Sequence, residues 1–158
     1  MMIDRFNSGT FVEIGAWKGR SACYVGERIK ETGKDIKYYV VDHFKGTKGE
    51  VHDFDVDVIN GTLYETFLKN IDPLKDYINV LKGDSKDMYV FFPPKSIDLL
   101  FLDGSHYYKD VKRDIKLWLP KVKGVIAGHD YDNPEVKKAV DEMLKVKIWN
   151  NCVWYADK

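Results

Sequence analysis

Short apolar runs recur along this sequence, and each is followed by a glycine or an acidic residue and then by an amphipathic stretch. The strongest run, residues 97–102, reads Ile-Asp-Leu-Leu-Phe-Leu and is almost uniformly apolar. Such a run is typical of a central parallel strand that helices cover on both faces. Strands that alternate with helices predict an α/β fold built on a largely parallel sheet.

The same pattern predicts five βα units and a terminal hairpin. Strands are predicted at residues 10–15, 36–41, 77–81, 97–102 and 122–127. Helices are predicted at residues 20–30, 63–71 and 107–119, with a short helix that ends near residue 91 and a last helix that Asn133-Pro134 opens. An antiparallel hairpin is predicted from residues 146–149 and 152–156. We therefore expect a mostly parallel, seven-stranded sheet with helices on both faces, in a single domain over residues 1–158.

Composition narrows the class of protein. The 158 residues are 44% hydrophobic and 32% charged, which fits a soluble globular domain. The 25 basic and 25 acidic side chains cancel, so no basic surplus favours a nucleic acid. No apolar stretch approaches the roughly 18 residues of a membrane span, and the N-terminus has no signal-like apolar core. Cys23 and Cys152 lack metal-like spacing and are interpreted as free thiols, so we expect a cytoplasmic protein with no membrane partner.

The first predicted strand ends in a glycine turn that contains Gly15 and Gly19, and a helical pattern begins near Ser21. An α/β sheet presents its strand ends to a nucleotide through this order of strand, glycine turn and helix. Glu13 lies near the end of the strand, where a core strand does not normally carry a charge. We interpret the turn as a ligand site; the alternative is an ordinary βα connection whose glycines only relieve crowding.

Acidic residues also follow the second and third predicted strands. Asp42 stands at the tip of the second strand, where an acid accepts hydrogen bonds from ribose hydroxyls. Its alternative role is to cap a turn. Asp84 and Ser85 follow the third strand and would either cap the next helix or border a bound base.

Residues 43–60 mix glycines, charges and aromatic residues without a clear period. A long irregular segment inside a compact domain is usually functional or mobile, so we interpret it as a lid or substrate loop. Four of its side chains are of types that bind metal ions, but they are best interpreted as part of a solvated acidic loop: His52, Asp53, Asp55 and Asp57.

Asp103 and Asp130 end two predicted strands that should be neighbours. Their carboxylates suit a hard divalent cation such as Mg²⁺, and a nitrogen from His129 would favour Mn²⁺ or a softer metal. His106 lies at the start of a helix, where the helix N-terminus disfavours an imidazolium. It is therefore predicted to be a neutral base that removes a proton from a substrate hydroxyl. The alternative is a set of helix caps and ion pairs.

Two motifs resemble one known family. Residues 13–21, Glu-Ile-Gly-Ala-Trp-Lys-Gly-Arg-Ser, resemble the first motif of class I S-adenosylmethionine-dependent methyltransferases, and the pattern is close to that of catechol O-methyltransferase. The second motif resembles the bacterial group of macrocin and related sugar O-methyltransferases. It consists of Asp103-Gly104-Ser105-His106-Tyr107, followed by Asp110, Asp114, Trp118 and Gly128-His129-Asp130-Tyr131.

The resemblance implies a Rossmann-like fold and a metal-assisted O-methyltransferase whose acceptor is a small hydroxylated molecule such as a sugar or natural product. It implies S-adenosylmethionine as the cofactor, held by Glu13, Gly15, Ala16, Gly19, Ser21, Asp42, His43, Gly83, Asp84, Ser85 and Asp103. The positions that match a site for Mg²⁺ or another divalent cation are Asp103, His129 and Asp130. His106 matches the position of the proposed base.

The chain departs from the family pattern in two places. It is short at its N-terminus and is expected to lack the helices that many relatives use to cover the acceptor. This leaves the acceptor open and is compatible with cover from a second subunit in a homo-oligomer. The usual glycine pair before the fifth strand is reduced to Gly124 followed by Val125, a change expected to affect only a turn.

The same residues argue against two rival functions, a dehydrogenase and a binding module without catalysis. An NAD-dependent oxidoreductase needs Gly-x-Gly-x-x-Gly, whereas this turn offers only Gly15 and Gly19 after an acid. A module that binds S-adenosylmethionine without catalysis would not need Asp103, His106 and Asp130 together.

Overall fold

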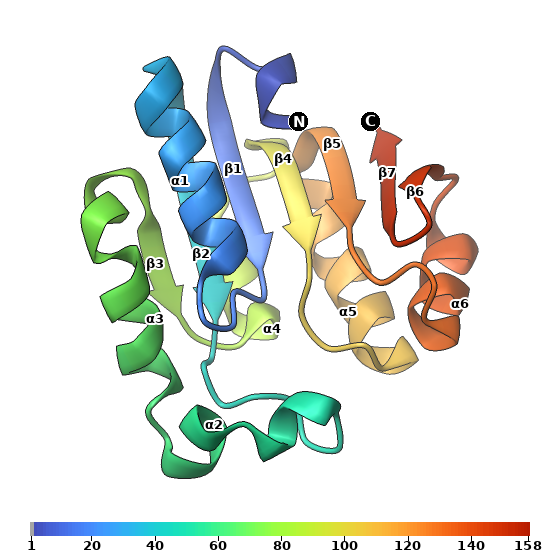
Figure 1. Cartoon of the computed structure of the whole chain (residues 1–158). Coiled ribbons are helices and arrows are strands. Elements are labelled where there is room, and N and C mark those ends of the chain that lie inside the picture. The colour runs from blue at the N-terminus through green and yellow to red at the C-terminus, as the bar shows by residue number, and fades with distance from the viewer. Residues whose placement is uncertain (1) are drawn as a thin grey trace.

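The computed structural model describes residues 2–158, except for the side chains at positions 2, 51 and 52. Its centre is a seven-stranded sheet in the order β3-β2-β1-β4-β5-β7-β6 (Figure 1). The strands are β1 (Ser8–Ile14), β2 (Asp35–Asp42), β3 (Asn79–Lys82), β4 (Ile97–Leu102), β5 (Val122–Gly128), β6 (Lys147–Asn150) and β7 (Val153–Asp157). The strands from β1 to β5 run parallel, and β7 pairs antiparallel with both β5 and β6. The predicted fold class is confirmed.

Helices cover both faces of the sheet, as predicted. The α-helices are α1 (Arg20–Thr32), α2 (Val56–Asn60), α3 (Leu63–Ile71), α4 (Ser85–Met88), α5 (Tyr108–Trp118) and α6 (Pro134–Met143). Short 3₁₀ helices span Met2–Arg5, Val51–Phe54, Asp72–Tyr77, Tyr89–Phe91 and Leu119–Lys121. One face of the sheet packs against α1 and α3, and the opposite face packs against α5 and α6.

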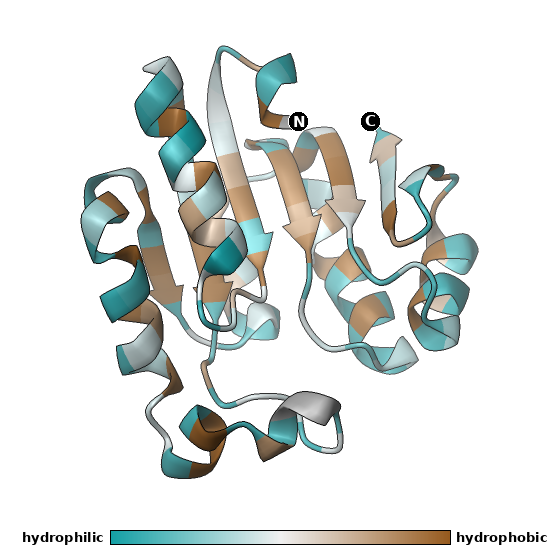
Figure 2. Ribbon diagram, viewed as in Figure 1, coloured by the Kyte–Doolittle hydropathy of each residue, from teal (hydrophilic) through white to brown (hydrophobic). Residues whose placement is uncertain are grey.

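The strands divide their side chains between two apolar layers because successive residues of a strand point to opposite faces. In β1, Phe11 belongs to the layer under α1 and α3, and Val12 belongs to the layer under α5 and α6. Phe67 fills the first layer and Trp118 fills the second, and both are fully buried. Figure 2 shows the result, with apolar strands at the centre and surrounding helices in which hydrophilic and hydrophobic residues alternate.

Helix ends follow the signals in the sequence. Gly33 ends α1 in the left-handed conformation, with φ of 62°, and its N–H bonds the carbonyl of Ile29. Asn133 caps α6 by accepting the N–H of Glu135, and Pro134 occupies the first turn. Both boundaries were predicted from these residue types.

Local predictions are corrected in two segments. Residues 43–60 are not wholly irregular, because Val51–Phe54 forms a 3₁₀ helix and Val56–Asn60 forms α2. Asp55 caps α2 by accepting the N–H of Asp57. The third strand begins at Asn79 rather than at residue 77, because the 3₁₀ helix Asp72–Tyr77 occupies the preceding residues.

Gly124 lies within β5 and not in a turn before it. A Cβ at this position would lie 2.3 Å from the backbone oxygen of Asp98. The β4–β5 register shifts between Ile97 and Leu99, so the glycine permits close approach of the two backbones at an irregularity. The expectation that this change affects only a turn is therefore wrong.

Two further expectations concern the membrane and the cysteines. Within the described part of the chain, no helix has both the length and the apolar character needed to cross a membrane. Cys23 and Cys152 are free thiols, as predicted.

The first testable prediction concerns Gly15, where β1 and β4 approach closely. Gly15 has φ of +87°, and a Cβ there would lie 2.1 Å from the backbone oxygen of Asp103. Gly33 also has a positive φ, of +62°, but has open space around its Cα. We expect Gly33→Ala to lower the free energy of unfolding by about 1–2 kcal/mol, the cost of a left-handed alanine. Gly15→Ala should cost several kcal/mol more, because the backbone of β4 must move.

Urea unfolding of the two variants, followed by circular dichroism, makes this comparison. Equal losses for Gly15→Ala and Gly33→Ala would show that the close approach of β1 and β4 contributes nothing beyond the backbone conformation.

Candidate active site

A cleft of about 1000 Å³ lies across the carboxyl ends of the parallel strands. Ligands bind at this edge in open α/β sheets. Most of the predicted cofactor positions line the cleft: Gly15, Ala16, Ser21, Asp42, His43, Gly83, Asp84, Ser85 and Asp103. The proposed base His106 and the metal candidates His129 and Asp130 line it as well. Glu13 and Gly19 do not line it, and each has a structural role beneath the turn.

Asp42 holds the glycine turn together. Its Oδ2 accepts the N–H groups of Ala16, at 2.8 Å, and Trp17, at 3.1 Å. Its Oδ1 accepts the N–H of Phe44 at 2.7 Å. Trp17 has φ of 52°, a conformation that a bulky residue adopts only where its surroundings enforce it. A carboxylate has about four acceptor positions, so Asp42 can hold the turn and still accept a hydrogen bond from the cleft.

Glu13 supports the turn from below. It is 2% exposed, and it accepts hydrogen bonds from the hydroxyls of Ser21 and Tyr38. Burial raises the pKa of its carboxyl to about 7, against the opposing effect of these two hydrogen bonds. Its contact with a cofactor stays a prediction. Gly19 packs against α3, where a Cβ would lie 2.9 Å from the ring of Phe67.

The loop after β3 is held by α5. Asp84 caps α4 by accepting the N–H of Lys86 at 3.1 Å, which confirms its alternative role as a helix cap. The Ser85 hydroxyl donates to Asp114 at 2.8 Å, and the Trp118 indole donates to the Ser85 carbonyl at 3.1 Å. Burial raises the pKa of Asp114. Asp84 and Ser85 also line the cleft, so capping and ligand binding are compatible at these positions.

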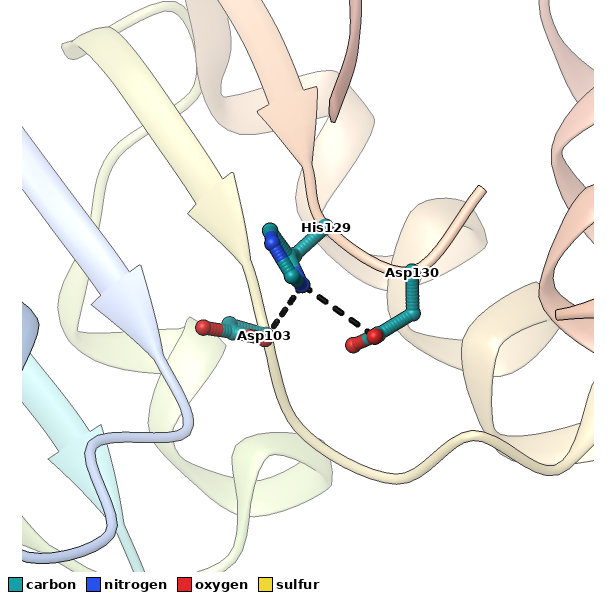
Figure 3. Close-up of side chains that lie close together, drawn as sticks. All are labelled: Asp103, His129 and Asp130. Atoms are coloured by element: carbon teal, nitrogen blue, oxygen red, sulfur yellow. Dashed lines mark ion pairs between the residues drawn. The ribbon is translucent and has the colours of Figure 1, made fainter. Parts of the chain in front are cut away.

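The predicted metal ligands converge at the ends of two neighbouring strands (Figure 3). Asp103 follows β4, and His129 and Asp130 follow β5. Each offers a ligand atom, and these atoms all lie within 4.8 Å of one another. The His129 Nδ1 lies 3.1 Å from Asp130 Oδ1 and 4.0 Å from Asp103 Oδ1. Two carboxylates and an imidazole form a donor set that fits a divalent cation, and no second cluster of this kind occurs among the described residues.

His106 lies between two carboxylates. Its Nε2 is 2.9 Å from Asp130 Oδ2, and its Nδ1 is 3.0 Å from Glu50 Oε2. The hydrogen bond to Asp130 is the main cause that raises the pKa of His106, and burial opposes it. This direction is opposite to the one expected from the helix N-terminus, and the role of His106 as a base stays a prediction. The carboxylates of Asp130 and Glu50 favour the charged ring, whereas α5 begins only at Tyr108, two positions further along.

The segment of residues 43–60, called the lid below, extends below the carboxyl ends of the strands in Figure 1. Lys18 of the glycine turn forms ion pairs with Asp55 and Asp57, both at 2.8 Å. Asp53 accepts the N–H of Gly49 at 2.8 Å. These acidic residues bind groups of the protein itself, so the interpretation of a merely solvated loop was incomplete. The His52 side chain lies outside the described residues.

Two residues of the site were missed in the sequence. Tyr38 lies in β2 and resembles any apolar strand residue, although the buried acid at Glu13 required some donor nearby. Glu50 lies 56 positions from His106, in a segment without periodicity, and no signal in the sequence identified it. Both contacts join segments that only the fold brings together.

Comparison with known proteins decides the family. Residues 12–131 match a family model described as a methyltransferase domain. The chain belongs to this methyltransferase family. A curated relative, the uncharacterized protein y4gI of Sinorhizobium fredii, is 49% identical over 37 residues. That match covers 22% of this chain and 4% of the relative, so the chain spans only a small part of that protein's length.

Solved structures share the methyltransferase fold. The O-methyltransferase NovP has a TM-score of 0.75 and 22% identity, over 99% of this chain and 74% of NovP. CalS11, a TDP-rhamnose 3'-O-methyltransferase of calicheamicin biosynthesis, has a TM-score of 0.65 and 16% identity, over 94% of this chain and 71% of CalS11. An S-adenosylmethionine-dependent O-methyltransferase from Thermotoga maritima has a TM-score of 0.68 and 14% identity, over 100% of this chain and 62% of that protein. The resemblance to class I methyltransferases is confirmed for family and fold.

The second prediction concerns the buried acid of this methyltransferase domain. The pKa of Glu13 is raised from 4.5 to about 7, so the unfolded chain releases this proton first as the pH rises. The stability that the protonated carboxyl contributes is present below pH 4.5 and is lost as the pH rises to about 7. At about 1.4 kcal/mol per pKa unit, this loss is about 3 kcal/mol.

Glu13→Gln removes the titrating proton, so its free energy of unfolding should gain about 3 kcal/mol relative to the natural chain between these pH values. Urea unfolding across this range measures the difference, and Glu65→Gln, at an exposed position of α3, is the matched control. Parallel pH curves for the natural chain and Glu13→Gln would contradict the raised pKa.

Proposed function

We propose that this chain is an S-adenosylmethionine-dependent O-methyltransferase, assisted by a divalent cation, that acts in the cytoplasm on a small hydroxylated molecule such as a sugar or natural product. The observation that carries the proposal is the convergence of three strand ends on one cleft. The glycine turn follows β1, Asp103 follows β4, and His129 and Asp130 follow β5. Membership of the methyltransferase family supports the class of reaction.

The cofactor would lie along the carboxyl ends of β1, β2 and β3. Gly15 and Ser21 would line its methionine part, Asp42 would accept hydrogen bonds from its ribose, and Asp84 and Ser85 would border its adenine. These side chains surround a cleft of about 1000 Å³, which is at the upper end of the size range of ligand pockets. The cleft therefore has room for an acceptor beside the cofactor.

The acceptor hydroxyl would react next to His106. Asp103, His129 and Asp130 fit a divalent cation, which when bound would polarise that hydroxyl. His106 in its neutral form would take the hydroxyl proton on Nε2. S-adenosylmethionine, when bound, would supply the methyl group: the acceptor oxygen would bond to the methyl carbon while the carbon–sulfur bond breaks, and the sulfur would keep the electron pair. This transfer needs mainly an aligned and deprotonated acceptor.

A small acceptor is supported by charge and by the structural neighbours. The 25 basic and 25 acidic side chains give no net positive charge to attract a nucleic acid. CalS11 is described as a sugar O-methyltransferase and NovP as an O-methyltransferase. A shared fold does not fix a substrate, so the acceptor has to be found by experiment.

Calorimetry tests the cofactor directly. We expect the protein to bind S-adenosylmethionine and not NAD, because the glycine turn lacks the dinucleotide pattern. Binding of NAD without binding of S-adenosylmethionine would overturn the proposal.

Transfer of a labelled methyl group tests the chemistry, with rhamnose, TDP-rhamnose and catechol as acceptors. We expect His106→Ala to bind S-adenosylmethionine normally and to lose about 100-fold or more in turnover, because a general base typically contributes that much. Cofactor binding without transfer to any acceptor would identify a binding module instead, and full activity of His106→Ala would exclude this residue as the base.

A charge-matched pair of variants tests the metal site. Asp130→Asn removes a carboxylate from the candidate cluster, and Asp132→Asn removes one from an exposed position two residues away. We expect added Mg²⁺ or Mn²⁺ to stimulate the natural chain and Asp132→Asn, and to have little effect on Asp130→Asn. Titration of Mg²⁺ and Mn²⁺ against activity measures this, and an equal response of all three proteins would remove the metal from the proposal.

A further inference from the structure

Glu50 reaches His106 from the lid. Its Oε1 accepts the backbone N–H of His106 at 2.8 Å, and its Oε2 lies 3.0 Å from Nδ1 of the same residue. One carboxylate therefore holds both the main chain and the ring of His106. The Glu50 side chain is only 11% exposed, so the contact is shielded from water.

The lid presents Glu50 from a backbone that is fixed on both sides. The Tyr107 hydroxyl donates to the Lys48 carbonyl at 3.0 Å, which joins the lid to the residue beside His106. Further along, Lys18 holds Asp55 and Asp57 against the glycine turn. The position of Glu50 therefore depends on contacts with the two halves of the site, the turn after β1 and the loop after β4.

The contact decides which ring nitrogen faces the reacting groups. Glu50 takes Nδ1, and Nε2 is left toward Asp130, at 2.9 Å from its Oδ2. A base works only when the nitrogen that accepts the proton points at the hydroxyl. In a metal-binding or catalytic histidine, the partner of the second ring nitrogen fixes the tautomer and the ring orientation.

We infer that Glu50 is a positioning residue of this enzyme: when the lid lies over the cleft, its carboxylate orients the His106 ring so that Nε2 faces the acceptor. The inference rests on the proposed function for the identity of the reaction. It goes beyond that function because it makes the lid part of the catalytic geometry, and not only a cover that excludes water.

Two substitutions separate positioning from a merely structural role. Glu50→Gln keeps the size of the side chain and one acceptor oxygen, so it can still cap the His106 N–H and hold the lid. Its NH₂ group then faces Nδ1 and can only donate, which opposes the Nδ1–H tautomer. Glu50→Ala removes both contacts. Glu65→Gln, exposed on α3, is the matched control.

Steady-state methyl transfer to rhamnose, TDP-rhamnose and catechol gives the first readout. We expect Glu50→Gln to lower kcat about 10- to 100-fold with little change in KM for S-adenosylmethionine, because a misoriented base slows chemistry without weakening cofactor binding. Glu50→Ala should lower kcat at least as much, and Glu65→Gln should match the natural chain. Natural kcat in Glu50→Gln would overturn the inference and leave Glu50 as a cap.

The second readout does not depend on turnover. Long-range ¹H–¹⁵N correlation spectra, with His106→Ala for assignment, report which ring nitrogen carries the proton. We expect a proton on Nδ1 of His106 in the natural chain and its loss in Glu50→Gln. If no acceptor is methylated, the proposed function fails, and these spectra still decide whether Glu50 orients the ring. An unchanged His106 signal in Glu50→Gln would overturn the inference.

Discussion

The close approach of Gly15 to the backbone of Asp103 is the constraint on which the site depends. The Asp103 N–H bonds the Ile14 carbonyl at 2.8 Å, and the Gly15 N–H bonds the Val41 carbonyl at 2.9 Å. Backbone hydrogen bonds therefore join the carboxyl ends of β1, β2 and β4 side by side. A side chain at Gly15 would force β4 away, since its Cβ would lie 2.1 Å from the Asp103 oxygen. The glycine turn and the acidic residues that follow β4 and β5, Asp103 and Asp130, can line one cleft only because this contact is short.

Two carboxylates stabilise this arrangement in opposite environments. Asp42 is at the cleft and accepts hydrogen bonds from backbone N–H groups of the turn. Glu13 lies beneath the turn among apolar residues, and burial raises its pKa to about 7. Near neutral pH the Glu13 carboxyl can hold a proton, which limits the negative charge packed under the turn. The domain thus combines an acid at the cleft that holds the glycine turn with a buried acid that fixes α1 and β2 to β1 through Ser21 and Tyr38.

Sequence patterns predicted the fold and the placement of most site residues because these depend on local signals. The apolar run at residues 97–102 had the same bounds in the structure as in the prediction, and Gly33 and Asn133 marked the helix boundaries as expected. The partners of the key side chains were not predictable in this way. Tyr38 is 25 positions from Glu13, and Glu50 is 56 from His106, so each pairing depends on strand order or on the path of the lid. The direction of the His106 pKa was not predictable for the same reason, because the carboxylates that raise it come mainly from the loop after β5 and from the lid.

The charge of the cleft follows from this geometry and bears on what it can bind. The whole chain carries equal numbers of acidic and basic side chains. Along the cleft the acidic side chains, among them Asp42, Asp103 and Asp130, outnumber the basic ones, which are Arg20, Lys48 and Arg113. A cleft with an excess of one sign of charge concentrates ligands of the opposite sign. The sulfonium of S-adenosylmethionine and a divalent cation are both positive, so the same carboxylates favour both. They disfavour a polyanion, and an acceptor that enters beside them is best uncharged or neutralised by the cation. The electrostatic character of the cleft depends only on which side chains the strand ends and the lid bring together.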